Sequence, residues 1–195
     1  MNNPIEIFAT WFAEAKNTPA ITEATAMILA TASKEGFPSA RVMLLKGFDE
    51  RGFTFFTNFE SRKSDEIKDN PHAALCFAWL PIGKQVRIEG KIEQVSDAEA
   101  DEYYASRPLI SRIGAWASSQ SRPLDERETL MQKVEELKKV YSEQNPPPRP
   151  PHWSGRRVIP NRIEFWQEGE FRLHDRNVYT RETPTSKWQV GKLYP

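Results

Sequence analysis

The sequence has little cysteine and little histidine. Cys76 is the one cysteine among 195 residues, so no disulfide or thiolate cluster can form within one chain, which is typical of a reducing compartment. Cys76 lies in an apolar run, where we expect a small, buried, hydrophobic side chain. The histidines, His72, His152 and His174, are too scattered for a metal site. We therefore expect no metal ion.

Excess charge and long hydrophobic runs are also absent. The 27 Lys and Arg balance the 27 Asp and Glu, and a net charge of zero gives no reason to expect a nucleic-acid partner. No apolar run approaches the ~18 residues of a membrane span. The N-terminus lacks the basic start and apolar stretch of a signal peptide, and no Gly-rich Rossmann fingerprint is present. We expect a cytoplasmic protein that does not bind membranes.

The sequence does contain short strand-like segments joined by tight turns. Apolar runs at 26–33 and 73–80 predict strands, and 84–95 alternates, with Val86, Ile88 and Ile92 on one face. The length suits one domain. This pattern favours a mainly β fold with helices (α+β), built on a small antiparallel barrel.

Helices are predicted at the N-terminus and in the middle of the chain. Apolar residues recur at helical spacing in 4–16. Ser96 and Glu99 form a capping box that opens a helix ended by Pro108. Tyr103 and Arg107 are four residues apart on it, so we place them on one face. A helix-like stretch at 109–121, a longer helix at 125–144 and a stiff proline-rich connector at 145–151 follow.

The stretch 40–63 reads as strand, turn, strand and helix start, with Ser61 as the N-cap. Arg62 and Lys63 then occupy the first helical positions, where the macrodipole disfavours cations. A bound anion at this helix start would explain them, whereas two solvated basic residues are the alternative. Arg41 and Lys46 present a second question. Their odd spacing sends them to opposite faces of a regular strand, so either a bulge intervenes or they serve different groups.

The last segment is predicted to be a β meander with strands at 158–167, 170–180 and 187–194. In the second of these strands, a period of two puts Arg172, His174 and Arg176 on one face. Trp166 lies on the adjoining strand. We interpret this cluster as facing an anionic ligand, with salt bridges to acidic neighbours as the alternative.

At this point the residues resemble a known family, the pyridoxine (pyridoxamine) 5′-phosphate oxidases. The resemblance runs from about residue 5 to the C-terminus. Its blocks are RVMLLK (41–46), FTN followed by SRK (56–63), KQVRIEGK (84–91), YYASRP (103–108), IGAWASSQS (113–121) and IEFWQEGEFRLHDR (163–176).

The resemblance implies a fold, a cofactor and an activity. The fold is an FMN-binding split barrel of six to eight antiparallel strands with flanking helices, forming one domain over 1–195. A helical annex lies around 97–144 and the β meander around 156–195. The implied assembly is a homodimer with FMN at the subunit interface. The implied reaction, part of vitamin B6 metabolism, oxidises pyridoxine 5′-phosphate and pyridoxamine 5′-phosphate to pyridoxal 5′-phosphate with molecular oxygen, releasing hydrogen peroxide and, from the amine, ammonia.

The resemblance also assigns site residues by position. Arg172 and His174 are the catalytic candidates, which position the substrate and assist proton movement. The substrate set is Lys46, Tyr103, Arg107, Ser111, Arg172, Leu173 and His174. The FMN set is Arg41, Val42, Met43, Leu44, Leu45, Lys46, Phe56, Thr57, Arg62, Lys63, Gln85, Gln120, Ser121, Trp166 and Arg176.

Two departures and two alternatives accompany this resemblance. Many relatives carry a basic N-terminal extension that helps to cover the site, whereas here only Met-Asn-Asn precedes Pro4, and Phe56 stands where a tyrosine is common. One alternative is a related flavin oxidase that acts on another aromatic precursor, as in phenazine synthesis. The other is a non-catalytic protein that binds flavin or pyridoxal phosphate. The RLHDR strand and the Tyr103, Arg107 and Ser111 set favour a phosphorylated B6 substrate.

Overall fold

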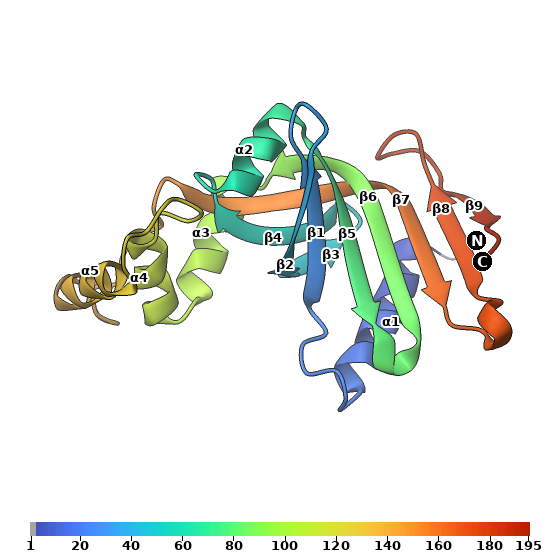
Figure 1. Cartoon of the computed structure of the whole chain (residues 1–195), viewed down its shortest axis with the longest axis horizontal. Coiled ribbons are helices and arrows are strands. Elements are labelled where there is room, and N and C mark those ends of the chain that lie inside the picture. The colour runs from blue at the N-terminus through green and yellow to red at the C-terminus, as the bar shows by residue number, and fades with distance from the viewer. Residues whose placement is uncertain (1–2) are drawn as a thin grey trace.

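The computed structural model describes residues 3–195, and its strands form one antiparallel sheet curled into a half-barrel (Figure 1). The order along the sheet is β2-β1-β5-β6-β7-β4-β3, and β8 and β9 continue from β7. The predicted mainly β fold with flanking helices is confirmed. The strands are β1 Ala26–Ala32, β2 Pro38–Leu44, β3 Gly47–Asp49, β4 Gly52–Asn58, β5 His72–Trp79, β6 Lys84–Gln94, β7 Trp153–Gln167, β8 Asp175–Thr180 and β9 Gln189–Lys192.

The core lies between the inner face of the sheet and the first helix, α1 (Pro4–Asn17). Phe8 is fully buried, and its ring lies 4.8, 4.9 and 5.1 Å from the rings of Phe48, Phe53 and Phe77. The alternation predicted for β6 is confirmed, because Val86, Ile88 and Ile92 all point into this core. Burial of such large apolar side chains is the main source of fold stability.

The other helices are α2 (Arg62–Asp69), α3 (Asp97–Ser106), α4 (Leu109–Ala117) and α5 (Arg127–Val140). The last three gather at one end of β7, whereas β8 and β9 lie at the other end (Figure 1). The capping box of Ser96 and Glu99 is confirmed. Strand β7 is 15 residues long, and at about 3.3 Å per residue it spans up to roughly 50 Å. Residues at its two ends are therefore far apart.

The strand expected to carry both Arg41 and Lys46 is broken. Strand β2 ends at Leu44, and β3 begins at Gly47. The Leu45 N–H donates to Thr25 O at 2.8 Å, whereas the Lys46 N–H donates to Thr54 O at 2.9 Å. The chain thus leaves one neighbouring strand for another between these residues. The expectation of opposite faces on one regular strand does not apply.

The strand predicted over 170–180 is wrong in its first half. Glu170–Arg172 form a short 3-10 turn, and β8 begins only at Asp175. Phe171 and Arg172 have positive φ angles of 54° and 64°, which turn the chain away from an extended path. Arg176 is the one member of the predicted basic face that lies in the strand.

Three smaller predictions also change. The stretch predicted to be helix-like to residue 121 ends as a helix at Ala117, so Gln120 and Ser121 lie in the following loop. Cys76 is half-buried on the outer face of β5 rather than enclosed in the core. Ser61 is the N-cap of α2 by position, but its hydroxyl donates to Asn58 O at 2.7 Å and does not cap the helix.

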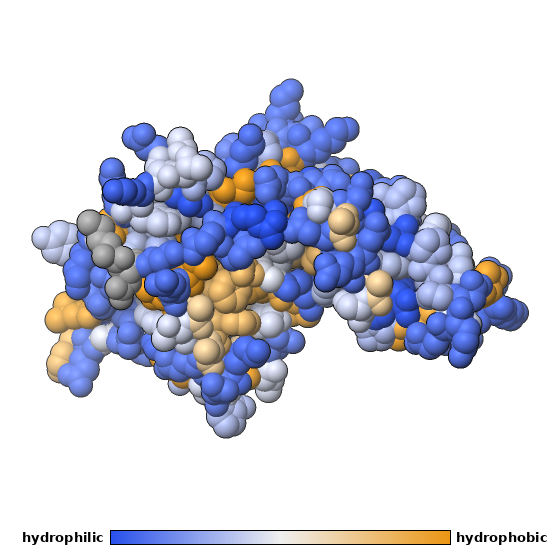
Figure 2. Space-filling view, turned by 180° about the vertical axis from the view of Figure 1, so that it is seen from behind, coloured by the Kyte–Doolittle hydropathy of each residue, from blue (hydrophilic) through white to orange (hydrophobic). Residues whose placement is uncertain are grey.

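The surface seen from behind is largely hydrophilic. Apolar residues gather mainly over the barrel half in that view (Figure 2). Within residues 3–195, no helix is long and apolar enough to cross a membrane.

Candidate functional site

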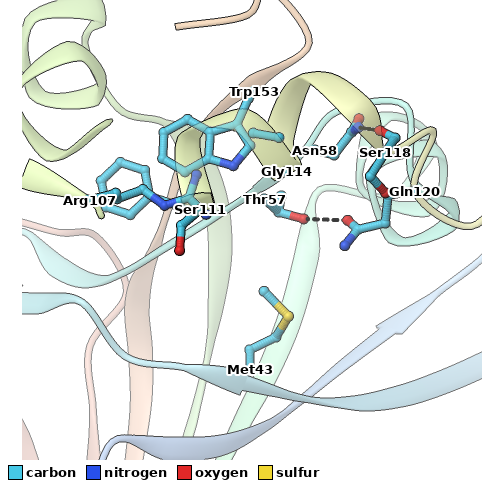
Figure 3. Close-up of a pocket in the computed structure, with 11 residues that line it drawn as sticks. Met43, Thr57, Asn58, Arg107, Ser111, Gly114, Ser118, Gln120 and Trp153 are labelled. Carbon is cyan, nitrogen blue, oxygen red and sulfur yellow. Dashed lines mark hydrogen bonds between the residues drawn. The ribbon is translucent and has the colours of Figure 1, made fainter. Parts of the chain in front are cut away.

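A cavity of about 380 Å³ lies where β2, β4, α4 and the start of β7 meet. Figure 3 shows Arg107, Ser111 and Trp153 at one end, Thr57, Asn58, Ser118 and Gln120 at the other, and Met43 between them on the facing strand. The structure thus brings together six residues predicted from sequence, namely Met43, Phe56, Thr57, Arg107, Ser111 and Gln120. Sequence reasoning missed Asn58, Gly114, Ala115, Ser118 and Trp153.

Phe56 and Trp153 form one wall of this cavity and belong to a stack of aromatic rings that also contains Tyr103. Phe56 lies 4.0 Å from Tyr103 at an interplanar angle of 19° and 5.3 Å from Trp153 at 13°. Gly155 permits this stack, because a Cβ there would lie only 2.8 Å from the Phe56 ring. Flat, rigid surfaces of this kind suit a planar aromatic ligand.

Arg107 lies at this wall, and no acidic side chain among residues 3–195 pairs with it. Its guanidinium sits 4.8 Å from the Trp153 ring, and its buried Nη1 has no acceptor among residues 3–195. Burial lowers the pKa of Arg107, and the nearby Tyr103 and Tyr104 oppose this only in part. An unpaired, half-buried cation is costly, and a bound anion would remove that cost. Arg107 is the C-cap of α3 rather than a residue of its last turn.

Lys63 lies behind the opposite end of the cavity, in contact with the lining residues Thr57 and Gln120. Its Nζ donates to Thr57 Oγ1 at 3.1 Å, Ser61 Oγ at 3.0 Å and Gln120 Oε1 at 3.0 Å. All three acceptors are neutral, and the side chain is only 7% exposed. Burial, and secondarily the charge of Arg41, lowers the pKa of Lys63 to about 8. Lys63 is thus a second buried cation that an anion would stabilise.

The two basic residues at the start of α2 therefore behave differently. Arg62 is exposed and pairs with Glu66 at 2.9 Å, which matches the solvated alternative.

Arg41 belongs to a network under α2, donating to Thr31 Oγ1 at 2.5 Å, to Ser39 and to Glu66. Burial opposes ionisation of Glu66, but hydrogen bonds from Ser39, Thr31 and Arg62 bring its pKa down to about 2.

The other residues between 42 and 46 that were predicted to bind FMN lie in different environments. Val42 and Leu44 point outward from β2 and are exposed, and Leu45 is buried. Lys46 lines a neighbouring cavity of about 360 Å³ together with Tyr103 and Phe56. Phe56 lines both cavities.

A second group of predicted residues lies at the far end of β7. Gln85, Trp166 and Arg176 are register partners across β6, β7 and β8, so they share the outer face of the sheet. The Trp166 and His174 rings lie 4.5 Å apart. The Gly169 N–H donates to His174 Nδ1 at 3.3 Å, which assigns the ring hydrogen of neutral His174 to Nε2. Arg172 and Leu173 are exposed in the adjacent turn.

These two groups do not meet within one chain. Arg107 contacts Trp153 and His174 contacts Trp166, the two being 13 positions apart on β7. That separation corresponds to about 40 Å along the strand. The cavity end and the His174 end are therefore two separate groups of residues, each referred to below as a candidate half-site.

Comparisons with known proteins give a consistent result. Residues 13–141 match the family model described as pyridoxamine 5′-phosphate oxidase. Residues 153–195 match the pyridoxine 5′-phosphate oxidase C-terminal dimerisation region, which supports formation of a homodimer.

Two curated relatives are similar over nearly the whole chain. The chain is 54% identical over 193 residues to the pyridoxine/pyridoxamine 5′-phosphate oxidase of Myxococcus xanthus (strain DK1622), covering 99% of this chain and 92% of the relative. It is 51% identical over 193 residues to the protein of the same name from Paraburkholderia phytofirmans, covering 99% and 89%.

Two solved structures share the fold. PhzG from Burkholderia lata 383, in complex with tetrahydrophenazine-1-carboxylic acid, superposes with a TM-score of 0.92 at 32% identity, covering 100% of this chain and 94% of that one. A pyridoxamine 5′-phosphate oxidase-related, FMN-binding protein from Nostoc punctiforme superposes with a TM-score of 0.77 at 19% identity, covering 100% and 98%. The sequence matches, the matched dimerisation region and the shared half-barrel together show that this chain belongs to the pyridoxamine 5′-phosphate oxidase family.

Proposed function

We propose that the protein oxidises pyridoxine 5′-phosphate and pyridoxamine 5′-phosphate to pyridoxal 5′-phosphate, with FMN as its cofactor and molecular oxygen as the oxidant. Hydrogen peroxide is the second product, and the amine substrate also releases ammonia. One observation carries this proposal. Within residues 3–195, Arg107 lines the cavity without a direct acidic partner, and Lys63 lies behind the opposite end, hydrogen-bonded to the lining residues Thr57 and Gln120. Two such cationic positions suit two phosphate groups, one on the cofactor and one on the substrate.

The Lys63 end suits the FMN phosphate. Lys63, Thr57 and Gln120 already form a hydrogen-bonded cluster at the start of α2, where backbone N–H groups also favour an anion. The cavity is flanked by Met43 of β2 and Phe56 of β4, which offer apolar contacts to a flat ring system. When bound, FMN supplies the redox chemistry by accepting a hydride from the substrate and passing the electrons to oxygen.

The Arg107 end suits the substrate phosphate. Arg107 and Ser111 line the cavity side by side (Figure 3), and Tyr103 stacks on the Phe56 that borders it. Lys46 approaches from the neighbouring cavity. A phosphate held by these donors would fix the substrate ring, so that the reaction becomes effectively unimolecular.

The other half-site would come from the second subunit. Arg172, His174 and Trp166 are too far along β7 to reach the cavity of their own chain. In a homodimer with FMN at the interface, they would meet the cavity of the partner. Because His174 Nδ1 accepts from the Gly169 N–H, the Nε2 atom is the one suited to orient a polar group of the substrate. We also propose that 1–195 forms one domain and that the protein acts in the cytoplasm.

A second candidate function rests on the superposition with PhzG. Such an enzyme would oxidise an aromatic carboxylic acid rather than a phosphate ester. Arg107 could bind either anion, but the 54% identity to a B6 enzyme over 193 residues favours the phosphate.

The experiment compares substrates under air. The purified protein should show flavin absorbance and convert pyridoxamine 5′-phosphate to pyridoxal 5′-phosphate with release of peroxide. Arg107→Ala should raise KM by about 10- to 100-fold because it removes a charge-assisted bond to phosphate, while FMN stays bound. Arg127→Ala, at an exposed arginine of α5, is the matched control and should leave KM unchanged. No turnover with either B6 phosphate would contradict the proposal, and loss of FMN from Arg107→Ala would mean that the two phosphate positions are exchanged.

A further inference from the structure

A buried carboxylate lies on the outer face of β7, outside every residue set predicted from sequence. Glu164 is only 2% exposed, although it lies on the face opposite the core. Its Oε1 accepts from Arg176 Nε at 2.8 Å and Arg176 Nη2 at 2.7 Å. Its Oε2 accepts from Arg162 at 3.1 Å and lies 3.7 Å from Arg87. Three arginines from three strands thus enclose one carboxylate.

The arrangement is not electrically balanced. Glu89 is the second carboxylate of the cluster, 3.2 Å from Arg87 and 3.5 Å from Arg162. Three guanidinium groups against these two carboxylates leave a net charge of +1. A buried carboxylate persists only when it is well paired, and its shortest contacts are those to Arg176. The remaining positive charge on this face is available to an anionic or electron-rich ligand.

The geometry fixes the orientation of Arg176. Two of its nitrogens share one oxygen of Glu164, and its Nη1 donates to Tyr194 O at 2.9 Å. A guanidinium that is hydrogen-bonded on both sides is held in a single orientation. Trp166 is the register partner of Arg176 and lies two residues after Glu164 on the same face. Glu164 therefore holds the Arg176 guanidinium beside the indole that contacts His174.

We propose that Glu164 is a positioning residue of the flavin site, which orders Arg176 so that it contributes to FMN binding. The inference rests on the proposed function, because it assumes that FMN is the ligand of this half-site. Buried partners that orient metal-binding side chains are typically worth about 10- to 100-fold in metal affinity, and we take the lower end of that range as the expected effect on FMN affinity here. Glu164 makes no direct contact with FMN in this proposal and acts through Arg176.

The test measures FMN affinity of the apoprotein by quenching of flavin fluorescence. Glu164→Gln keeps the shape of the side chain but removes its charge, and we expect FMN to bind about tenfold more weakly. Glu89→Gln is the matched control, because Glu89 pairs with Arg87 and Arg162 but makes no ion pair with Arg176. It should leave FMN affinity within about twofold. If the wild-type protein itself does not bind FMN, the proposed function fails, whereas equal affinities of wild type and Glu164→Gln overturn this inference alone.

A double-mutant cycle separates positioning from a general loss of stability. In an Arg176→Ala background, Glu164→Gln should cause no further loss of FMN affinity, because its effect passes through Arg176. An equal further loss in that background would overturn the proposal.

If Glu164→Gln does not fold, Arg162→Gln provides the second test. It leaves the Arg176 pair intact, so FMN affinity should stay near wild type, and a loss as large as that of Arg176→Ala would contradict the proposal.

Discussion

A lysine surrounded by neutral oxygens titrates closer to neutral pH than an exposed lysine. Lys63 donates to Thr57, Ser61 and Gln120, and its pKa falls to about 8 because burial disfavours the ammonium form. In the unfolded chain the pKa is higher, so the native state is the first to lose the proton as pH rises. The contribution of Lys63 to the free energy of unfolding therefore increases as the pH rises above about 8. Below about pH 8 the side chain is an ammonium ion, which is the form that a phosphate would stabilise.

The resulting prediction concerns cofactor binding as a function of pH. FMN affinity of the apoprotein should be constant near pH 7 and should fall above about pH 8, by at most about tenfold per pH unit, because binding then requires a proton to be taken up. Lys63→Met should bind FMN more weakly at pH 7 and lose this dependence. Fluorescence titrations at several pH values measure both. An unchanged bend near pH 8 in Lys63→Met would show that another group titrates.

The sequence alone left two interpretations open for Arg62 and Lys63, and the structure shows that their surroundings differ. Arg62 finds Glu66 one turn later, a local pairing that spacing alone could have indicated. Lys63 is buried by Thr57 and by Gln120 of a distant loop, and no local pattern encodes that contact. Trp153 was missed for the same reason, since its role depends on Phe56 and Tyr103.

At the scale of elements, the aromatic wall depends on one glycine. Gly155 of β7 lies under the Phe56 ring, and a Cβ there would be 2.6 Å from Val95 Cγ2 and 2.8 Å from the ring. Gly155→Ala should therefore destabilise the protein by about 1–3 kcal/mol, as overpacking does. Urea unfolding of the apoprotein measures this.

Gly114→Ala is the control for that prediction, because a Cβ there meets nothing within 4 Å and the residue lies in α4. Alanine favours a helix over glycine by up to about 1 kcal/mol, so this variant should be neutral or more stable. Equal stability of the two variants would show that the stack adapts to the added methyl group.

Elements defined by local patterns were the predictable ones. The alternation of β6 and the capping box of α3 each depend only on residues close together in the sequence, and both are confirmed. The turn at 170–174 was not predictable, because Phe171 and Arg172 adopt positive φ angles that non-glycine residues seldom adopt. The alternation of side chains that predicted a strand over 170–180 gives no sign of this turn. The break at Leu45 was hidden likewise, since it depends on a change of hydrogen-bond partner between two strands.

At the scale of the whole molecule, the length of β7 sets the assembly that the proposed activity requires. Arg107 and His174 contact tryptophans at opposite ends of this strand (Figure 1), and residues 153–195 match a dimerisation region. A site that uses both must take Arg107 from one subunit and His174 from the other. Each homodimer then has two such sites, related by the symmetry of the pair.

Subunit mixing tests this directly. Arg107→Ala and His174→Ala should each be strongly impaired, because every site in either homodimer lacks one residue. If equal amounts are unfolded together and refolded, half of the dimers are mixed, and each mixed dimer has one intact site. Activity should recover to about a quarter of wild type. If both residues served one site from the same chain, every site in the mixed dimer would still carry a substitution, and no activity would return. Mixing without unfolding, which leaves the homodimers intact, is the control and should show no recovery.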